Sequence, residues 1–267
     1  MSNELLTRDD APFGEAVWVA IDGAVLSAAK NQLTARRILD VDGPFGLGLT
    51  SIPAGEAAEV NGMSVNPPLP LAMIRKAFTL PVRDIATIEE AGMPVSLSAA
   101  AAAAVECARV EDALVFKGAE KLGIPGLLKA KGAGRVTLRD WADVGTAAED
   151  VIEAVTTLDG AGFAGPYALA LAPPLYNRLL RRYPQGNATE LEHLRTIVTA
   201  GIVKAPSIGG GGVLLASGRP FASIVLGQDL MTAFLGPGEE GFEFLVSESL
   251  TLRLAEPGAV VVLKPAG

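Results

Sequence analysis

Apolar residues recur at helical spacing in two long stretches of the chain. Over Glu15–Leu39 they are separated by charged and polar residues, a pattern that predicts one long amphipathic helix. Residues 40–48 contain three glycines and a proline, so the helix is expected to give way to a turn there. A second long helix is predicted over Ala99–Leu122, with Ser98 as its N-cap and a glycine and a proline after its end.

Shorter periodic segments fill the second half of the chain. Thr146 with Glu149, and Asn187 with Glu190, have the spacing of capping boxes at the starts of two helices. The predicted helices are 146–160, 174–182 and one from 187 that is closed at 201, and the predicted strands are 167–171, 213–216, 223–226, 242–247, 251–254 and 259–263. Because helices and strands do not strictly alternate, the predicted fold class is α+β.

A long segment between the two long helices, residues 47–80, lacks the pattern of a packed domain. Two short extended pieces, Leu49–Ile52 and Ala72–Leu80, flank the middle Pro53–Pro70, which is too polar in its centre to form a core of its own. Long loops in compact domains are usually functional or disordered. Binding to a neighbouring subunit would explain such an arm.

Composition removes several classes of function. The 267 residues are 49% hydrophobic and carry a net charge of −8, which excludes disorder as the main state and gives no basic footprint for nucleic acid or an anionic membrane. No apolar run supplies the ~20 residues of a membrane-spanning helix. The amino-terminal residues carry acids where a secretory signal has a basic region, so we expect a cytoplasmic protein. One cysteine permits no intrachain disulfide and no cysteine-based zinc site.

The chain offers no recognisable catalytic or metal-binding constellation. Gly209–Gly212 is not followed by the lysine of a phosphate-binding loop, so a hairpin turn is expected. His193 has no second histidine or cysteine partner and is expected at a surface or an interface. Cys107 falls on the apolar face of its helix and should be inert. The adjacent acids Glu111 and Asp112 are explained by a solvated face or a salt bridge. We therefore predict no enzyme, no catalytic residues and no metal.

Several short motifs occur in one order over nearly the whole chain, from Trp18 to Lys264. They include Trp18-x-x-Ile21-Asp22, Gln32-Leu33-x-x-Arg36-Arg37-x-x-Asp40-Val41-Asp42-Gly43-Pro44-Phe45-Gly46, Phe78-Thr79-Leu80, Gly123-Ile124-Pro125-Gly126, Gly165-Pro166-Tyr167 and Gly227-Gln228-Asp229-Leu230. In combination they resemble the encapsulins, the linocin-like shell proteins of bacterial and archaeal nanocompartments (family 1). The resemblance implies the HK97 phage-capsid fold.

That resemblance also implies a division of the chain. The implied parts are an N-terminal arm and helix belonging to the P-domain (1–42), the E-loop (43–77), the P-domain with its spine helix (78–134), the A-domain (135–226), a return to the P-domain (227–255) and a last A-domain strand (256–267). The E-loop would pair with strands of a neighbouring subunit, which gives the long arm its explanation.

Two sites follow from the resemblance. A groove for the C-terminal targeting peptide of a cargo enzyme would be formed by Arg36, Ile38 and Asp40 on one side and Leu230 and Ala233 opposite. A surface ion pair between Arg36 and Asp40, four residues apart on a helix, is the alternative. The loop lining a fivefold pore would consist of Tyr183, Pro184, Gln185, Gly186, Asn187, Ala188 and Thr189.

The implied function is that of an icosahedral, self-assembling shell subunit that encloses a ferritin-like protein or a dye-decolourising peroxidase, with a role in iron storage or oxidative stress. Some family members stack flavin on a tryptophan where this chain has Arg83, so no flavin is expected. The partners expected are further copies of the chain and the cargo, without nucleic acid or membrane. Two alternatives remain open: a prophage major capsid protein, and an enzyme of the protease or bacteriocin type.

Overall fold

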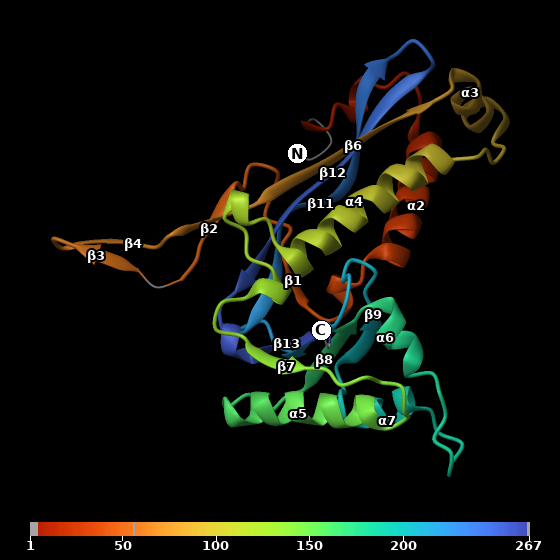
Figure 1. The fold of residues 1–267 in the computed structure, drawn as a ribbon. Helices are drawn as coiled ribbons and strands as arrows, with labels where there is room; N and C mark the ends of the chain where they lie inside the picture. Colours follow the sequence, from red (N-terminus) through yellow and green to blue (C-terminus); the bar gives the residue numbers. More distant parts are fainter. Residues whose placement is uncertain (1–4, 56, 266–267) are drawn as a thin grey trace.

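The computed structural model describes residues 5–55 and 57–265, which form two layered parts and a projecting arm (Figure 1). The helices are α2 (Glu15–Gln32), α3 (Val82–Ala91), α4 (Ser98–Lys117), α5 (Thr146–Gly160), α6 (Pro173–Arg178) and α7 (Glu190–Ile197), with 3-10 turns η1 (Arg8–Asp10), η2 (Ala35–Arg37), η3 (Glu120–Leu122), η4 (Leu127–Lys129) and η5 (Pro257–Ala259). The strands are β1 (Asp40–Asp42), β2 (Ser51–Pro53), β3 (Ala58–Val60), β4 (Met63–Val65), β5 (Pro68–Pro70), β6 (Ala72–Leu80), β7 (Gly134–Thr137), β8 (Tyr167–Leu171), β9 (Gly201–Lys204), β10 (Gly212–Ala216), β11 (Ala222–Pro237), β12 (Phe242–Leu254) and β13 (Val260–Lys264).

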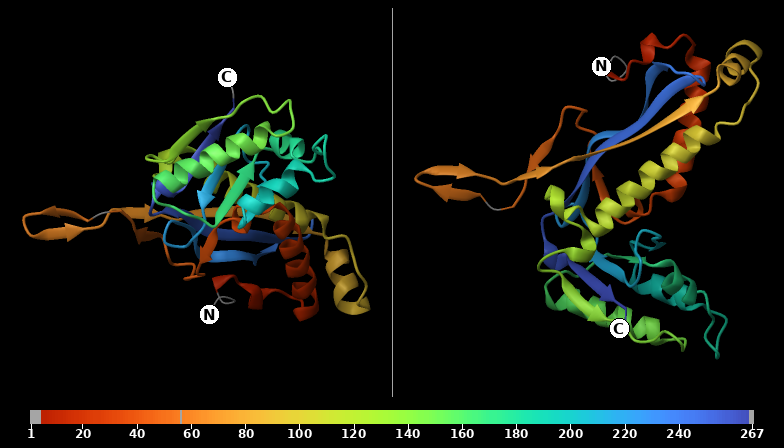
Figure 2. Two further views of the ribbon diagram at one scale, coloured as in Figure 1. Left: turned by 90° about the horizontal axis from the view of Figure 1, so that it is seen from below. Right: turned by 45° about the horizontal axis from the view of Figure 1, so that its top comes forward.

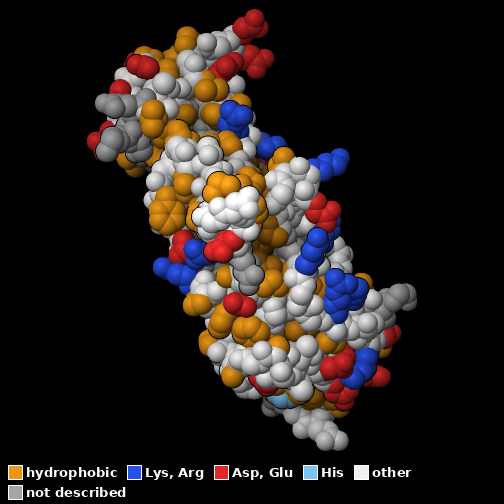
Figure 3. Space-filling view, turned by 90° about the vertical axis from the view of Figure 1, so that its left-hand side faces the viewer, with side chains coloured by type: hydrophobic (Ala, Val, Ile, Leu, Met, Phe, Trp, Pro, Cys, Tyr) orange, Lys and Arg blue, Asp and Glu red, His pale blue; other side chains and the backbone are white. Residues whose placement is uncertain are grey.

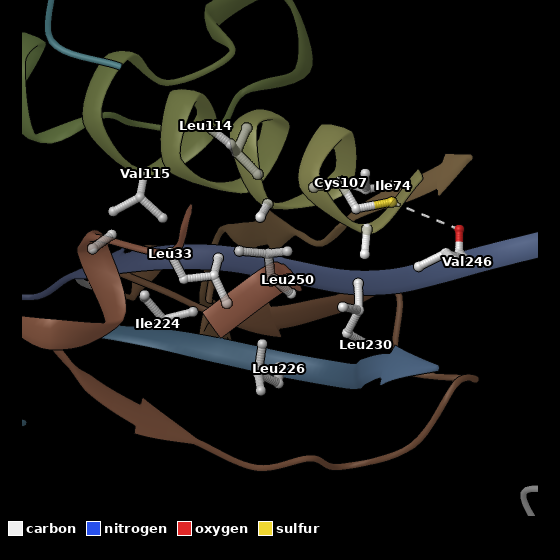
Figure 4. Packing of buried hydrophobic residues seen from close by; sticks show 14 of the residues in the cluster. Leu33, Ile74, Cys107, Leu114, Val115, Ile224, Leu226, Leu230, Val246 and Leu250 are labelled. Atoms are coloured by element: carbon white, nitrogen blue, oxygen red, sulfur yellow. Dashed lines mark hydrogen bonds between the residues drawn. The ribbon is translucent and has the colours of Figure 1, made fainter. Parts of the chain in front are cut away.

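The first layered part is a four-stranded sheet covered by α2 and α4. Its strand order is β1-β11-β12-β6, and β1 runs parallel to β11 while the other pairs are antiparallel. The two helices lie side by side (Figures 1 and 2). Small buried side chains such as Ala100 and Ala104 on α4 allow this close approach. Leu114, Leu230 and Leu250 belong to the apolar core between α4 and the sheet (Figure 4).

The second layered part is a five-stranded sheet in the order β7-β13-β10-β8-β9, with α5 and α7 packed against it. Alternate residues of β8 enter different cores, because successive side chains of a strand point to opposite faces. Leu169 and Leu171 join a cluster with Trp141, whereas Ala168 and Ala170 join the core shared with the first part. Both faces of the sheet are therefore covered, and the two parts share a continuous core.

The arm is built from two small antiparallel ribbons, β2 with β5 and β3 with β4, and it projects well away from both layered parts (Figure 2). All residues of β3 and β4 are exposed. Asn61 and Gly62 form the turn between them with positive φ angles of 51° and 77°, as a tight two-residue hairpin requires. Thus the expected arm is present, but it contains regular strands.

The helix predicted over Glu15–Leu39 is shorter than expected. Its last helical bond runs from the N–H of Leu33 to the carbonyl of Ala29 at 2.9 Å. The next two backbone N–H groups, of Thr34 and Ala35, donate to the Asp112 carboxylate on α4. A contact distant in the sequence therefore ends α2 at Gln32, and Arg36 lies in η2.

The start of α5 also corrects a prediction. Thr146 is the first helical residue and its side chain makes no capping hydrogen bond, so the capping box with Glu149 is absent. The Glu190 carboxylate accepts the N–H groups of Gly145 at 2.9 Å and Ala148 at 3.0 Å instead. A buried carboxylate from α7 therefore replaces the local cap.

Several elements differ in extent from the prediction. The segments 242–247 and 251–254 form one continuous strand, β12, and β11 extends far beyond 226. Because β11 joins the four-stranded sheet from Ala222 onward, a domain boundary at 226 falls inside a strand. The second long helix ends at Lys117, where Gly118 has a φ of 73°. The helix α3 and strands β7 and β9 were not predicted from the pattern.

Candidate functional site

The Arg36 side chain joins four elements of the first layered part. Its Nε and Nη2 donate to the two carboxylate oxygens of Glu111 on α4, each at 2.8 Å. Its Nη1 donates to Asp229 on β11 at 2.8 Å, and Nη2 also donates to Glu248 on β12 at 3.0 Å. We call these four residues the Arg36 cluster. One guanidinium therefore binds three carboxylates from three elements.

The cluster is largely removed from water. The side chains of Glu111 and Glu248 are 0% and 1% exposed, whereas Asp229 is 48% exposed at its edge. Burial, followed by the charge and hydrogen bond of Glu111, raises the pKa of Glu248 to about 9. Burial opposes the charge of Arg36, but its bonds with Glu111 and Asp229 outweigh this and raise its pKa. Near neutral pH Glu248 therefore holds a proton, and the buried charges of Arg36 and Glu111 balance.

Glu111 and Asp112, neighbours in the sequence, hold two consecutive parts of the chain. Asp112 accepts hydrogen bonds from the N–H groups of Thr34 and Ala35 and from the Thr34 hydroxyl. Burial raises the pKa of Asp112 although these hydrogen bonds favour its charged form. The predicted salt bridge is thus confirmed for Glu111, but a solvated face is wrong because both acids are buried.

The five residues predicted for the cargo-peptide groove lie in different environments. Ile38, Leu230 and Ala233 are only 5%, 8% and 7% exposed, so most of their surface already packs inside the subunit. Asp40 is exposed at the start of β1. In the described part of the chain Arg36 bonds with the acids of its cluster and makes no ion pair with Asp40, so the alternative of a helical surface pair is wrong.

Two surface hollows adjoin the Arg36 cluster. One, of about 300 Å³, is lined by Arg36, Arg37, Ile38, Leu39, Asp40, Ala200, Ser217 and Gly218. The other, of about 250 Å³, is lined by Leu5, Pro44, Gly46, Leu47, Gln228, Asp229 and Met231. The structure thus brings Arg36, Ile38 and Asp40 to one hollow, and Leu230 and Ala233 line neither of the two. The use of these residues for cargo stays a prediction.

The predicted pore loop, residues 183–189, connects α6 with α7 at the end of the second layered part (Figure 1). Residues 184–188 are exposed, and the Tyr183 N–H donates to the Ala188 carbonyl at 3.1 Å. The helix that follows is capped by Thr189 with Glu192, whereas Asn187 with Glu190 was the predicted pair. The Tyr183 hydroxyl lies 2.8 Å from Nδ1 of His193, which is the surface position expected for that histidine. The pore function stays a prediction.

Two further positions have simple environments. Cys107 is buried, as predicted, and burial raises the pKa of its thiol to about 12. Arg83 is exposed in the first turn of α3, and the absence of flavin beside it stays a prediction. Among the helices of residues 5–55 and 57–265, none is long and apolar enough to cross a membrane. The same residues contain no group of three or more His, Cys, Asp or Glu side chains that could hold a metal ion.

The sequence pattern did not identify three members of the Arg36 cluster as partners of Arg36. Asp229 stood in a motif without an assigned role, Glu111 was expected at a solvated face or in a salt bridge with no partner named, and Glu248 lay between two predicted strands. One signal in the sequence could have indicated a buried ion pair: an acidic residue within a mostly apolar extended run, because such an acid is rarely buried without a partner. The partner itself is 212 residues away in the chain, beyond the reach of local spacing.

Comparison with known proteins gives concordant matches. A family model described as "Encapsulating protein for peroxidase" matches residues 3–251. The type 1 encapsulin shell protein EncA of Myxococcus xanthus is 34% identical over 280 residues, 99% of this chain and 98% of that protein. A diheme-cytochrome-encapsulin shell fusion protein of Kuenenia stuttgartiensis is 31% identical over 92% of this chain and 72% of its own length. The crystal structure of a virus-like particle from Pyrococcus furiosus matches with a TM-score of 0.76 at 24% identity, covering 92% of this chain and 98% of that one.

Proposed function

The chain belongs to the encapsulin shell-protein family, and on that premise we propose that its copies close into an icosahedral shell around a cargo enzyme. Encapsulin shell proteins are structural, capsid-like proteins rather than enzymes, and they form a multimeric compartment. The interpretation of the chain as an enzyme is therefore set aside. The fold is the one that encapsulins share with HK97-type phage capsids. The family match favours a nanocompartment shell over a prophage capsid.

The projecting arm is the observation that carries the shell proposal. Val60, Met63 and Val65 at its end are 62%, 65% and 65% exposed. The outer edges of β3 and β4 pair with no other strand of the described residues. Exposed strand edges with apolar side chains are avoided in monomers because they pair with other chains. A neighbouring subunit that covers the arm satisfies both the backbone groups and the apolar surface.

Charged substitutions in the arm test this assignment. The double variant Val60→Glu/Val65→Glu is expected to fold but to remain unassembled, because both side chains would carry charge into a subunit contact. The conservative pair Val60→Ile/Val65→Ile should assemble. Electron microscopy and size-exclusion chromatography measure assembly, and circular dichroism measures folding. Normal shells from the glutamate variant would refute the arm contact, and an unmodified protein that stays monomeric in every buffer would refute the shell.

We propose further that the cargo is held through a short C-terminal peptide near the Arg36 cluster. The support is the pair of adjoining hollows, one mostly apolar beside Asp229 and one beside the exposed carboxylate of Asp40. Such a surface suits an extended peptide, with apolar contacts for side chains and a charge to fix direction. The proposed cargo is a peroxidase or a ferritin-like protein, and the description of the matching family supports the peroxidase.

Cargo loading can be measured with a fluorescent protein that carries the C-terminal tail of a peroxidase or ferritin-like protein encoded beside the shell gene. The reporter should co-purify with unmodified shells and be lost from shells with Asp40→Lys. The control Asp143→Lys makes the same charge change at an exposed residue of the second layered part. Equal loading of both variants would contradict a role for Asp40.

A further inference from the structure

Carboxylates gather at one end of the molecule, the upper end in Figure 3. We call Glu89, Glu90, Glu239 and Glu240 the acidic tip. The first two end α3 and the other two form the turn between β11 and β12. All four are exposed, and none makes an ion pair with another residue in the described part of the chain. The Glu89 carboxylate accepts the N–H of Gly14, the N-cap residue of α2, at 3.1 Å. The charges of Glu90, Glu239 and Glu240 are left without an opposite partner among the described residues.

The turn that carries two of these glutamates is firmly held. The Gly238 N–H donates to the Gly241 carbonyl at 2.7 Å, which closes the turn around Glu239 and Glu240. A Cβ added at Gly241 would lie 2.2 Å from the carbonyl oxygen of Leu80 on β6. This close backbone contact anchors the turn to the end of the sheet. The two carboxylates are therefore presented on a convex, ordered projection.

A surface of opposite character lies midway along the molecule. The chain has a net charge of −8, yet residues 117–135 contain five basic residues and one acid. A hollow of about 750 Å³ in this segment is lined by three lysines, Lys117, Lys129 and Lys131, and by one acid, Glu120, and we call it the basic hollow. Lys129 has one weak partner, Glu120 at 3.4 Å, and both side chains are more than half exposed. The other two lysines form no ion pair within residues 5–55 and 57–265.

Exposed apolar side chains accompany both charged surfaces. Leu122, 61% exposed, is the last residue of η3 beside the basic hollow. Val82, 56% exposed, begins α3, and Met93, 59% exposed, lies just after its end. Apolar side chains surrounded by charge are the usual composition of a protein interface, with an apolar centre and a polar rim. Each surface thus combines features that a partner of opposite charge would cover.

We propose that the acidic tip of one subunit docks into the basic hollow of a second copy of the chain, an inference that rests on the proposed shell function. A convex acidic turn faces a concave basic surface, so shape and charge are both complementary. Because the two surfaces lie on different parts of the subunit, the contact is head-to-tail. Contacts of that type close into rings and shells when the rotation between copies allows it.

A charge exchange tests the contact. Glu239→Lys/Glu240→Lys reverses the acidic tip, Lys129→Glu/Lys131→Glu reverses the basic hollow, and a third protein carries all four changes. Asp140→Lys/Asp143→Lys controls for net charge, because it reverses two exposed acids of the second layered part, outside both surfaces. Assembly is followed by light scattering against subunit concentration, with electron microscopy to identify closed particles and circular dichroism to check folding.

Each reversed pair should raise the subunit concentration needed for assembly by roughly tenfold or more, since like charges across an interface oppose association. The protein with all four changes should recover most of the lost assembly, and the control should assemble as the unmodified protein does. The differences should shrink near ~1 M salt, where the Debye length falls to about 3 Å.

Two outcomes would overturn the contact. One is assembly of the single reversed pairs at the concentration of the control. The other is assembly of the protein with all four changes that is as impaired as that of the reversed pairs or more so. If the unmodified chain forms shells in either case, only this contact is refuted. A monomeric unmodified chain would refute the shell and the contact together.

Discussion

Replacing Arg36 by methionine removes the charge at the centre of the Arg36 cluster while keeping a side chain of comparable length. Four hydrogen bonds to three carboxylates are lost. Asp229, at 48% exposure, regains water, but Glu111 at 0% cannot. The main cost is therefore a buried carboxylate without a partner.

Removing one partner of a buried ion pair typically costs about 3–5 kcal/mol, whereas an exposed pair is worth about 1 kcal/mol or less. Because Glu248 holds its proton near neutral pH, the variant leaves one uncompensated charge, Glu111, rather than two. We therefore expect Arg36→Met to lower the free energy of unfolding by about 3 kcal/mol, the lower end of that range.

Arg37→Met is the matched control. Arg37 is exposed and its side chain donates only to the backbone carbonyls of Lys30 and Asn31, so its loss should cost about 0.5 kcal/mol or less. Urea unfolding of the full chain, followed by tryptophan fluorescence, measures the free energy of unfolding of both variants. The measurements belong in the Val60→Glu/Val65→Glu background at one protein concentration, because assembly adds to apparent stability. A difference between the two variants below about 1 kcal/mol would refute the account of the cluster.

The remaining predictions concern other buried groups. Because burial, with the Glu111 charge, raises the pKa of Glu248 from 4.5 to about 9, the folded state binds an extra proton between these values and stability should fall as pH rises through that interval. In urea unfolding measured across this pH range, Glu248→Gln should lack the fall in stability, whereas Glu243→Gln, at an exposed position of the same strand, should retain it. The same dependence of stability on pH in both variants would contradict the assignment of the proton to Glu248. Cys107 should react with a maleimide only in denaturant, and labelling of the folded protein at the rate of a free thiol would be inconsistent with its burial. Glu190→Ala should destabilise the chain by about 1–3 kcal/mol, since two backbone N–H groups at the start of α5 lose their acceptor. In the same assay Glu149→Ala, at an exposed position, should be nearly neutral. Equal losses of stability in the two variants would contradict the assignment of the cap to Glu190.

Local periodicity predicted much of the fold. The apolar stripe of α2 and the alanine-rich start of α4 were evident because the residues three and four apart that define a helix face are close in the sequence. The predicted N-cap of α4 is wrong, because Ser98 is the first helical residue, Leu97 is the N-cap, and no side chain caps the helix. Strand β8 was likewise evident as a short apolar run, as expected for a strand covered on both faces. Helix ends were less predictable. Helix α2 ends where the next backbone N–H group, that of Thr34, donates to the carboxylate of Asp112, 78 residues away, and not to a carbonyl of the helix.

The candidate site shows the same division. The sequence located Arg36 and Asp40 through a motif and placed both on one helix. The structure puts Arg36 in η2 and Asp40 in β1, and it supplies Glu111 and Glu248 as the partners of the arginine. A sequence motif identifies residue types and their spacing. It carries no information on which distant carboxylate will meet a guanidinium when three elements pack.

Composition and local spacing were enough to predict the class of fold, the scarcity of catalytic chemistry and the presence of an arm without a core, because both are properties of neighbouring residues. Three features could be known only after folding: two adjacent acids are buried in different networks, Glu190 caps a helix other than its own, and acidic and basic surfaces lie apart on one subunit. Each of these depends on segments distant in the chain coming together. Between packed segments, where water is excluded, the energy of a charged group depends mainly on the groups that surround it, and this environment exists only in the folded chain.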